Sequence, residues 1–247
     1  MNPEPTAHGQ PNVVLLSDED ATIELLQRAV GGLWDVVSEL TRLRRTQHPN
    51  YRVTIFGSAR ARPGIYPYDE VKRLATGLTA LGCDIITGGG PGLMQAANEG
   101  AAAAGAGAPG RSIGIRVELP FEQEVNAFVG EMYRHKTFFS RLHQFMIASD
   151  AFVVVPGGIG TLLELSMTWQ LLQVSQLRRT PLVVVGRVWA ELVDWARAHM
   201  LRPDLPMANA ADMDIPRCVG TVEETIAIIR QDREEWLVQQ AAAAQPR

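Results

Sequence analysis

Two glycine-rich segments occur where the sequence predicts a buried strand running into a helix. Residues 87–94 read TGGGPGLM and residues 156–161 read PGGIGT. Glycines at such junctions let the backbone adopt positive φ and let a ligand approach the main chain closely. The helix that follows supplies unpaired N–H groups and a partial positive charge, which favour a phosphate. The two segments therefore predict a phosphate site, and the alternative for each is a tight turn that needs glycine.

Neither segment matches the common nucleotide-binding motifs. A Walker A loop ends in Gly-Lys-Ser/Thr, and no lysine follows either segment. The dinucleotide fingerprint G-x-G-x-x-G/A also fails, because its sixth position falls on Leu163 or Leu93. A leucine there hinders the close helix–strand packing that the third glycine permits. The pattern favours a mononucleotide or another single phosphate over NAD or ATP.

Glu164 follows the second glycine segment by one helical turn. Together with Thr161 it matches the capping box S/T-x-x-E, so spacing alone favours a helix cap. Its position favours another role, because the repulsion between a carboxylate and a bound phosphate costs free energy that a functional role has to offset. Cleavage of a glycosidic bond offers such a role, since a carboxylate stabilises the oxocarbenium-like transition state.

Other residues capable of chemistry carry weaker signals. Arg141 lies beside an expected apolar helix stripe, and its position alone favours an exposed surface arginine. His135 and His143 have no companions at metal-ligand spacing and are expected to be structural or surface residues. Lys136 lacks surroundings that resemble a pyridoxal phosphate site. The sequence therefore predicts neither a metal nor a cofactor.

Expected strands and helices alternate along the chain from residue 51. Apolar runs predict strands at 53–56, 83–87, 113–117, 151–155, 182–185 and 214–219. Helices are expected at 67–81, 92–104, 137–149, 161–176, 188–200 and 221–237. This alternation predicts a Rossmann-like, doubly wound α/β fold with a mostly parallel sheet and helices on both faces. Ligands of such sheets bind at the carboxyl ends of the strands, where both glycine segments fall.

The two ends of the chain differ from this α/β region. Residues 1–16 and the tail 239–247 are expected to be disordered or flexible. Ser17 is the candidate N-cap of an extra N-terminal helix at about 19–46. The apolar stripe of that helix comprises Ile23, Leu25, Leu26, Val30, Leu33, Val36, Val37 and Leu40. Residues 17–238 are expected to form a single nucleotide-binding domain, because no linker or repeat divides them.

Composition narrows the classes of function. The formal net charge of −4 gives no electrostatic reason to expect nucleic acid or an anionic membrane as partner. The first residues lack the apolar stretch of a signal peptide, and no window approaches the roughly 20 apolar residues of a membrane helix. Cys83 and Cys218 have no metal-type spacing and are expected to be buried thiols in a reducing compartment. These features predict a cytoplasmic protein.

Four ordered motifs resemble the family named after the plant Lonely Guy protein, also called possible lysine decarboxylases. They are FGSAR at 56–60, TGGGPGLMQAANEGA at 87–101, LPFEQEVN at 119–126 and PGGIGTLLE at 156–164. The third is similar to a segment of the family's longer bacterial branch, and the fourth matches its signature P-G-G-x-G-T-x-x-E. The resemblance covers residues 51–200, more than half of the chain.

The resemblance implies a phosphoribohydrolase, which splits a nucleoside 5′-monophosphate into free base and ribose 5-phosphate. The substrate would be a cytokinin riboside monophosphate or an AMP-like nucleotide. By the resemblance, Glu164 is the catalytic carboxylate and Arg141 falls at the position of the catalytic arginine. The family is also similar in needing no metal and in forming homodimers whose sites lie near the subunit interface.

By the same resemblance, the phosphate is held by Gly157, Gly158, Gly160 and Thr161. Further candidates for contact with the nucleotide are Gly88, Gly89 and Gly90 of the first glycine segment and Ser58. Three residues of the third motif are candidates to stack on or hydrogen-bond a base, namely Phe121, Gln123 and Asn126. Polar loop residues also often serve their own turn, so the base itself is not predicted.

Three positions depart from the family pattern. Leu142 replaces a lysine after the catalytic arginine, and Leu163 and Met167 replace acids on either side of the signature glutamate. Loss of these polar groups points to an altered substrate, a slower turnover, or a non-catalytic carrier or sensor of a phosphorylated ligand. The related molybdenum-cofactor carriers resemble the last case. Because Arg141 and Glu164 are both kept, hydrolysis of nucleoside monophosphates is the leading prediction.

Overall fold

The computed structural model describes the chain except residues 1–18, 43–47, 105–109, 118–124, 178–179 and 244–247. Contacts divide the chain into two units, Met1–Arg45 and Thr46–Arg247. The described part of the first unit is one helix, α1 (Glu19–Arg42), which continues through Gly31 and Gly32. The expected cap Ser17, the expected disordered residues 1–16 and positions 43–46 of the expected helix lie outside the described residues.

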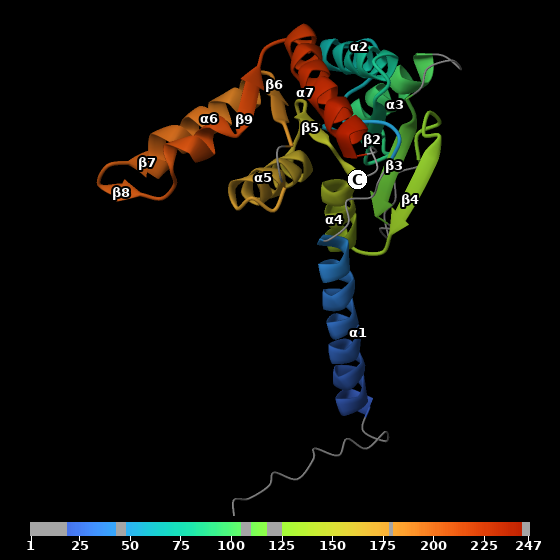
Figure 1. The fold of residues 1–247 in the computed structure, drawn as a ribbon, viewed down its shortest axis with the longest axis vertical. Coiled ribbons are helices and arrows are strands. Elements are labelled where there is room, and N and C mark those ends of the chain that lie inside the picture. Colours follow the sequence, from blue (N-terminus) through green and yellow to red (C-terminus); the bar gives the residue numbers. More distant parts are fainter. Residues whose placement is uncertain (1–18, 43–47, 105–109, 118–124, 178–179, 244–247) are drawn as a thin grey trace, which may run out of the picture. The chain divides into compact units, whose positions relative to one another are not determined.

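The second unit is built on a seven-stranded sheet with the order β4-β3-β2-β1-β5-β6-β9 (Figure 1). Its strands are β1 (Arg52–Phe56), β2 (Asp84–Thr87), β3 (Ser112–Val117), β4 (Glu131–His135), β5 (Ala151–Val154), β6 (Leu182–Val185) and β9 (Pro216–Val219). Every neighbouring pair in this sheet is parallel. The strand order reverses at β1, which pairs with β2 on one side and with β5 on the other. Such a reversal is where doubly wound sheets open a crevice for ligands.

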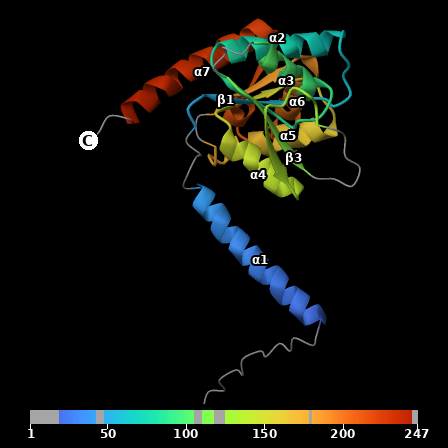
Figure 2. The ribbon, with the colours of Figure 1, turned by 90° about the vertical axis from the view of Figure 1, so that its right-hand side faces the viewer.

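Helices cover both faces of this sheet. One face is packed by α2 (Tyr66–Ala80), α3 (Leu93–Ala103) and α7 (Val222–Ala243), and the other by α4 (Phe138–Ala148), α5 (Ile159–Gln173) and α6 (Arg187–Met200). Figure 2 shows α2 and α7 on one side of the strands and α4 on the other. After α6, a hairpin of β7 (Leu201–Arg202) and β8 (Leu205–Pro206) and a 3₁₀ helix η1 (Ala210–Asp214) lead back to β9 (Figure 1). The predicted doubly wound α/β fold is confirmed.

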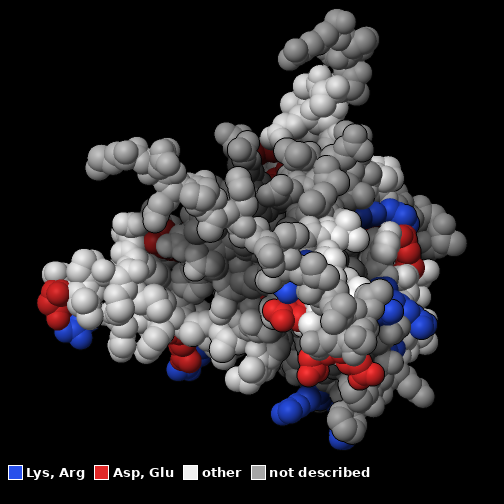
Figure 3. All heavy atoms as spheres, turned by 90° about the horizontal axis from the view of Figure 1, so that it is seen from below, with Lys and Arg blue, Asp and Glu red and all other residues white. Residues whose placement is uncertain are grey.

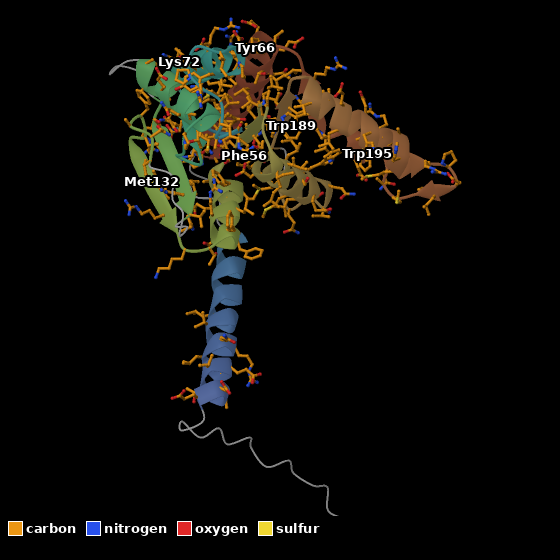
Figure 4. The ribbon with its side chains drawn as sticks, turned by 180° about the vertical axis from the view of Figure 1, so that it is seen from behind. Phe56, Tyr66, Lys72, Met132, Trp189 and Trp195 are labelled. Carbon is orange, nitrogen blue, oxygen red and sulfur yellow. The ribbon has the colours of Figure 1, made fainter. Side chains whose placement is uncertain are left out.

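Alternation within the buried strands separates two apolar cores, because successive side chains of a strand point to opposite faces. In β1, Ile55 belongs to the core under α2, α3 and α7, whereas Phe56 belongs to the core under α4, α5 and α6. Phe56 (Figure 4) meets Phe145 of α4 edge-to-face at 5.1 Å between ring centroids and stacks near Phe152 of β5. A strand buried on both faces therefore places apolar side chains in both cores.

Three details differ from the sequence-based expectations. β4 was not predicted, because it is an edge strand and its sequence EMYRH lacks an apolar run. The tail expected to be flexible from residue 239 continues α7 to Ala243, since glutamine and alanine are strong helix formers. Cys83 is buried as expected, but Cys218 is exposed because β9 is the other edge of the sheet. No helix of the described ranges has the length and apolar character needed to cross a membrane.

Candidate active site

The two glycine segments lie side by side because one residue after β1 hydrogen-bonds to both. The N–H of Ser58 donates to the carbonyl of Pro156 at 3.1 Å, and its own carbonyl accepts from the N–H of Leu93 at 2.7 Å. Gly92 permits this approach: its φ is +73°, and a Cβ there would lie 2.3 Å from the Ser58 oxygen. The carboxyl ends of β1, β2 and β5 are thereby joined into one continuous loop surface.

Side chains behind the first glycine segment hold its shape. The hydroxyl of Thr87 accepts the N–H of Gly89 at 2.9 Å and donates to the side-chain oxygen of Asn98 at 2.7 Å. The N–H of Asn126 donates to the carbonyl of Gly89 at 3.0 Å. Gly89 itself has a φ of +70°, which an L side chain rarely adopts. The segment is therefore fixed by the residues beneath it before any ligand binds.

Asn126, one of the three base-side candidates, supports the first glycine segment. Its amide group donates to the carbonyl of Gly90 at 2.9 Å and to the side-chain oxygen of Asn98 at 3.0 Å. These two bonds use both amide hydrogens, and the residue is only 8% exposed. This polar loop side chain thus serves its own turn, and the base contact expected for it stays a prediction. The other base-side candidates, Phe121 and Gln123, lie outside the described residues.

The second glycine segment runs directly into α5. The helix begins at Ile159, two residues earlier than its periodicity predicted, and its N-cap Gly158 has no side-chain hydrogen bond. The first-turn N–H groups are therefore left without a capping side chain, the arrangement that binds phosphates at helix N-termini. A Cβ at Gly158 or Gly160 would meet nothing within 4 Å, so a ligand has access to the main chain there.

The early start of α5 excludes the capping box suggested by the sequence. Thr161 lies inside the first turn, is buried, and packs so tightly that a Cβ on Gly157 would lie 2.2 Å from its hydroxyl oxygen. Because Gly158 is the N-cap, Glu164 is not the reciprocal partner of a capping threonine. The carboxylate is left for another interaction.

That interaction is with Arg141, which reaches Glu164 from α4. The Nη2 atom of Arg141 lies 3.6 Å from Oε1 of Glu164, and the two side chains are 15% and 12% exposed. Arg141 also donates from Nε to the carbonyl of Ile115 at 3.1 Å and lies over the ring of Phe145 at 5.2 Å. The arginine is thus buried and oriented, in contrast to the exposed arginine that its spacing favoured.

Arg141 also contacts the first glycine segment. A Cβ on Gly88 would lie 2.5 Å from Nη2 of Arg141 and 2.7 Å from the sulfur of Met94, so only glycine fits beside the guanidinium. Glu164, the partner of Arg141, lies about 7.5 Å along the α5 axis from Ile159, at 1.5 Å rise per residue. The ion pair therefore lies between the two loops, within reach of a small molecule that contacts both.

Burial alters the ionisation of this pair. Desolvation raises the pKa of Glu164 to about 7, and the positive charge of Arg141 only partly offsets this. Desolvation also lowers the pKa of Arg141, which the charge of Glu164 partly restores. Arginine stays protonated in proteins, so the pair presents a fixed cation beside a carboxyl that exchanges its proton near neutral pH. Such a carboxyl suits acid–base chemistry.

The unpredicted strand β4 adds further neighbours to the site. Met132 (Figure 4) packs against the first glycine segment: its methyl group would lie 3.2 Å from a Cβ on Gly89. At the end of the strand, desolvation lowers the pKa of His135, with contributions from the charges of Arg141 and His143. His135 is therefore a largely neutral neighbour of the ion pair. The sequence signal for this edge is the polar segment Glu131–His135, which lies between Gly130 and Thr137, the N-cap of α4.

The three positions that lack the family's polar residues are accommodated differently. Leu142 is buried at 6% exposure and Met167 packs partly buried against the core beneath α4, α5 and α6. Leu163 is 50% exposed on α5. Two of the replacements thus fill the core, and the third adds to an exposed apolar surface.

The other charged groups that the structure describes do not form a metal site, and the two lysines lie on the surface. In the described part of the chain, no group of three or more His, Cys, Asp or Glu could hold a metal ion. Lys72 pairs with Glu99 at 2.7 Å on the outer side of α2 and α3 (Figure 4), and Lys136 is exposed. Figure 3 shows acidic and basic residues interspersed on the described part of one face.

Comparisons with known proteins agree with this fold. The family model described as "Possible lysine decarboxylase" matches residues 94–229, which include Arg141 and Glu164. A search of curated proteins gives no match. Among solved structures, the chain is similar to the molybdenum cofactor carrier protein from Chlamydomonas reinhardtii, with 21% identity and a TM-score of 0.55 over 74% of this chain and 98% of that one.

Two further structures have the same fold. The molybdenum cofactor binding protein from the phototrophic bacterium Rippkaea orientalis is 18% identical, with a TM-score of 0.56 over 75% of this chain and 98% of that one. The structural-genomics target TM1055 is 20% identical, with a TM-score of 0.52 over 73% of this chain and 99% of that one. At these identities the likeness concerns the fold alone.

Proposed function

The chain belongs to the possible lysine decarboxylase family, and from this premise we propose that it hydrolyses the N-glycosidic bond of nucleoside 5′-monophosphates. The observation that carries the proposal is the buried Arg141–Glu164 pair between two glycine segments, one of which starts a helix with uncapped N–H groups. The substrate would be AMP-like or a cytokinin riboside monophosphate, and the products would be the free base and ribose 5-phosphate.

In this proposal the phosphate binds first, at the start of α5. The N–H groups that follow Gly157 and Gly158 donate to its oxygens, and the helix dipole favours its negative charge. The ribose then extends from the phosphate toward the ion pair, with Ser58 and the segment of Gly88, Gly89 and Gly90 on its other side. Fixing the phosphate orients the anomeric carbon, which lowers the entropic part of the barrier.

The bond between the anomeric carbon and the base nitrogen breaks in the second step. Both electrons of that bond leave with the base, and positive charge grows on the ribosyl ring, where the carboxylate of Glu164 stabilises it. A water oxygen bonds to the anomeric carbon, and Glu164 accepts one of its protons and passes it to the departing base. Arg141 holds the carboxylate in place through the contact at 3.6 Å.

The phosphate dependence of recognition tests the proposal most directly. We expect AMP to bind or react far better than adenosine, because uncapped main-chain N–H groups recognise the phosphate and the described residues offer no comparable base contact. The measurement incubates the purified protein with a panel of nucleoside monophosphates and nucleosides and detects free base by chromatography. Equal behaviour of AMP and adenosine would rule out the phosphate site.

The pH dependence follows from the raised pKa of Glu164. The carboxylate form is needed to stabilise the ribosyl cation, and protonation removes it as pH falls below about 7. We therefore expect kcat/KM for AMP to rise with pH through an inflection near 7, far above the usual glutamate value of about 4.3. AMP affinity is measured over the same range as control, because the phosphate ionises near pH 6. A rate that stays flat from about pH 6 to 8 would contradict this role.

The second candidate function is a non-catalytic carrier of a phosphorylated ligand. It is favoured by the loss of polar groups at Leu142, Leu163 and Met167, and two structures that share the fold are named as molybdenum cofactor carrier or binding proteins. A carrier would bind AMP or a related phosphorylated ligand tightly and release no base from any nucleotide. The retained and buried ion pair favours the enzyme.

A homodimer is part of the proposal. The helices that carry the ion pair expose large apolar side chains: Phe139 and Ile159 are each 82% exposed, and Leu163 is 50% exposed. Exposed apolar groups of this kind mark interaction surfaces, and a second copy of the chain would cover them next to the site. We expect light scattering at micromolar concentration to give twice the chain mass of 27.0 kDa. A monomer mass would contradict the expectation.

A further inference from the structure

Helix α1 carries an apolar repeat, and the side chains of this repeat that the structure describes are exposed. Apolar residues recur at alternating intervals of three and four, at Ile23, Leu26, Val30, Leu33, Val37 and Leu40. The first four of these side chains are 52%, 58%, 67% and 65% exposed. Alternating intervals of three and four average 3.5 residues, which is the seam of a left-handed coiled coil.

The residue types along this seam indicate what covers it. The positions that begin each heptad (a) hold Ile23, Val30 and Val37, and the positions three residues later (d) hold Leu26, Leu33 and Leu40. β-Branched residues at a with leucine at d favour parallel pairs of helices over higher oligomers. We infer that α1 pairs with α1 of a second copy of this chain as a parallel two-stranded coiled coil.

The residues that flank the seam agree with a parallel pair. The e and g positions between its first and last apolar residues hold Gln27, Ala29, Trp34 and Val36. None of these is charged, so two identical helices meet in parallel without repulsion between like charges. Gly31 and Gly32 fall at b and c, away from the seam, and a Cβ at either would meet nothing within 4 Å. These glycines weaken an isolated helix, which increases its need for a partner.

The charges of α1 distinguish a protein partner from a membrane. Its sequence contains five acidic residues, which are Glu19, Asp20, Glu24, Asp35 and Glu39, against two arginines. Amphipathic helices that lie on membranes carry lysine and arginine on the polar face, since these attract anionic lipids. The acidic residues of α1 are repelled by a surface of anionic lipids. They do not interfere with apolar packing between two copies of the helix.

Three heptads form a short coiled coil, and short helices are marginal on their own. A second contact between the two copies, such as the proposed one through Phe139 and Ile159, would raise the effective concentration of one α1 near the other. The inference does not depend on the proposed hydrolysis, because its test measures only how two helices face each other.

Site-specific disulfide formation in the full-length protein tests the inference. In a parallel pair identical d residues face each other, so Leu26→Cys is expected to form a covalent dimer almost completely under mild oxidation. The exposed Cys218 is first replaced by serine, and the buried Cys83 is kept. The matched control is Leu25→Cys, whose parent residue is 45% exposed but lies at a c position outside the seam. Non-reducing electrophoresis is expected to show little dimer for this control.

A second d position keeps the test decisive if Leu26→Cys perturbs the helix. Leu33→Cys is expected to cross-link like Leu26→Cys, with a circular dichroism spectrum that matches the parent protein. Failure of both variants to cross-link would overturn the pairing, and α1 would then cover another surface. Cross-linking only in a Leu26→Cys/Val37→Cys double variant would mean antiparallel helices and would also overturn it. Equal cross-linking at positions 25 and 26 would refute the heptad register.

Discussion

Replacing Glu164 by glutamine is expected to abolish most base release while AMP still binds. The amide has nearly the same size as the carboxyl group but cannot stabilise a ribosyl cation by charge or take a proton from water. Removing such a group lowers the rate by roughly 100-fold or more, which is about 2.7 kcal/mol of barrier. Single-turnover release of adenine from AMP, followed by chromatography, measures the effect. AMP affinity should be retained or increased, because a negative charge near the phosphate is removed.

The same variant should not be less stable than the parent protein at pH 8. Because the folded-state pKa of Glu164 is raised to about 7, its contribution to stability is full below the unfolded pKa and is lost as pH rises toward 7. Glutamine mimics the protonated form and avoids that loss, which offsets the weakened contact with Arg141. The melting temperature, by scanning calorimetry, is therefore expected to be unchanged or higher.

A matched control is Glu191→Gln, which removes an exposed glutamate on α6 that pairs only along its own helix with Arg187. This control should leave the rate unchanged. If the parent protein releases base and Glu164→Gln releases it equally fast, Glu164 has no catalytic role. If the parent protein binds AMP and releases no base from any nucleotide, the carrier function is correct.

Replacing two glycines of the site by alanine is expected to have different effects, on AMP affinity at Gly158 and on the stability of the fold at Gly92. Gly158→Ala should leave the melting temperature unchanged, because a Cβ there meets nothing within 4 Å. It should weaken AMP binding by roughly tenfold, or about 1.4 kcal/mol, because the methyl group occupies the space where a phosphate approaches the helix start. Isothermal titration calorimetry measures this loss.

Gly92→Ala should instead destabilise the fold. Its φ is +73°, and the new Cβ would lie 2.3 Å from the main-chain oxygen of Ser58, which no side-chain movement relieves. Positive φ and this clash together cost at least about 2 kcal/mol, which lowers the melting temperature by roughly 4 °C or more in a domain of this size. Normal stability of Gly92→Ala would contradict the structural role of Gly92. Normal AMP affinity of Gly158→Ala would contradict the role of Gly158 in phosphate binding.

The sequence was sufficient for the central part of the sheet because the buried strands are marked by their own composition. β5 and β6 are short uninterrupted apolar runs, whereas β1 and β2 combine apolar residues with the buried polar side chains of Thr54, Asp84 and Thr87. The edge strand β4 has no such mark, since its residues are partly exposed and its pairing with β3 is a tertiary event. Edge strands are therefore the elements that local patterns miss.

The same distinction applies to the candidate site. The glycine segments were visible because glycine is required locally, by positive φ at Gly89 and Gly92. The burial of Arg141 was not visible, because it depends on contacts with Ile115 of β3 and Glu164 of α5, which are distant in sequence. The capping box at Glu164 was misleading because α5 begins at Ile159 with Gly158 as its N-cap, so Thr161 lies inside the first turn.

The main-chain bonds of Ser58 have a consequence for how this site diversifies. Both hydrogen bonds that hold the two loops together use the backbone N–H and C=O of this residue, at 3.1 Å to Pro156 and 2.7 Å to Leu93. These two bonds are therefore available to any side chain at position 58, whereas the serine hydroxyl adds a local bond by accepting the N–H of Arg60 at 3.1 Å. Substitutions at position 58 can therefore change the contacts with the ligand while the distance between the two glycine segments stays constant. Ligand preference can change in this way without loss of the loop arrangement.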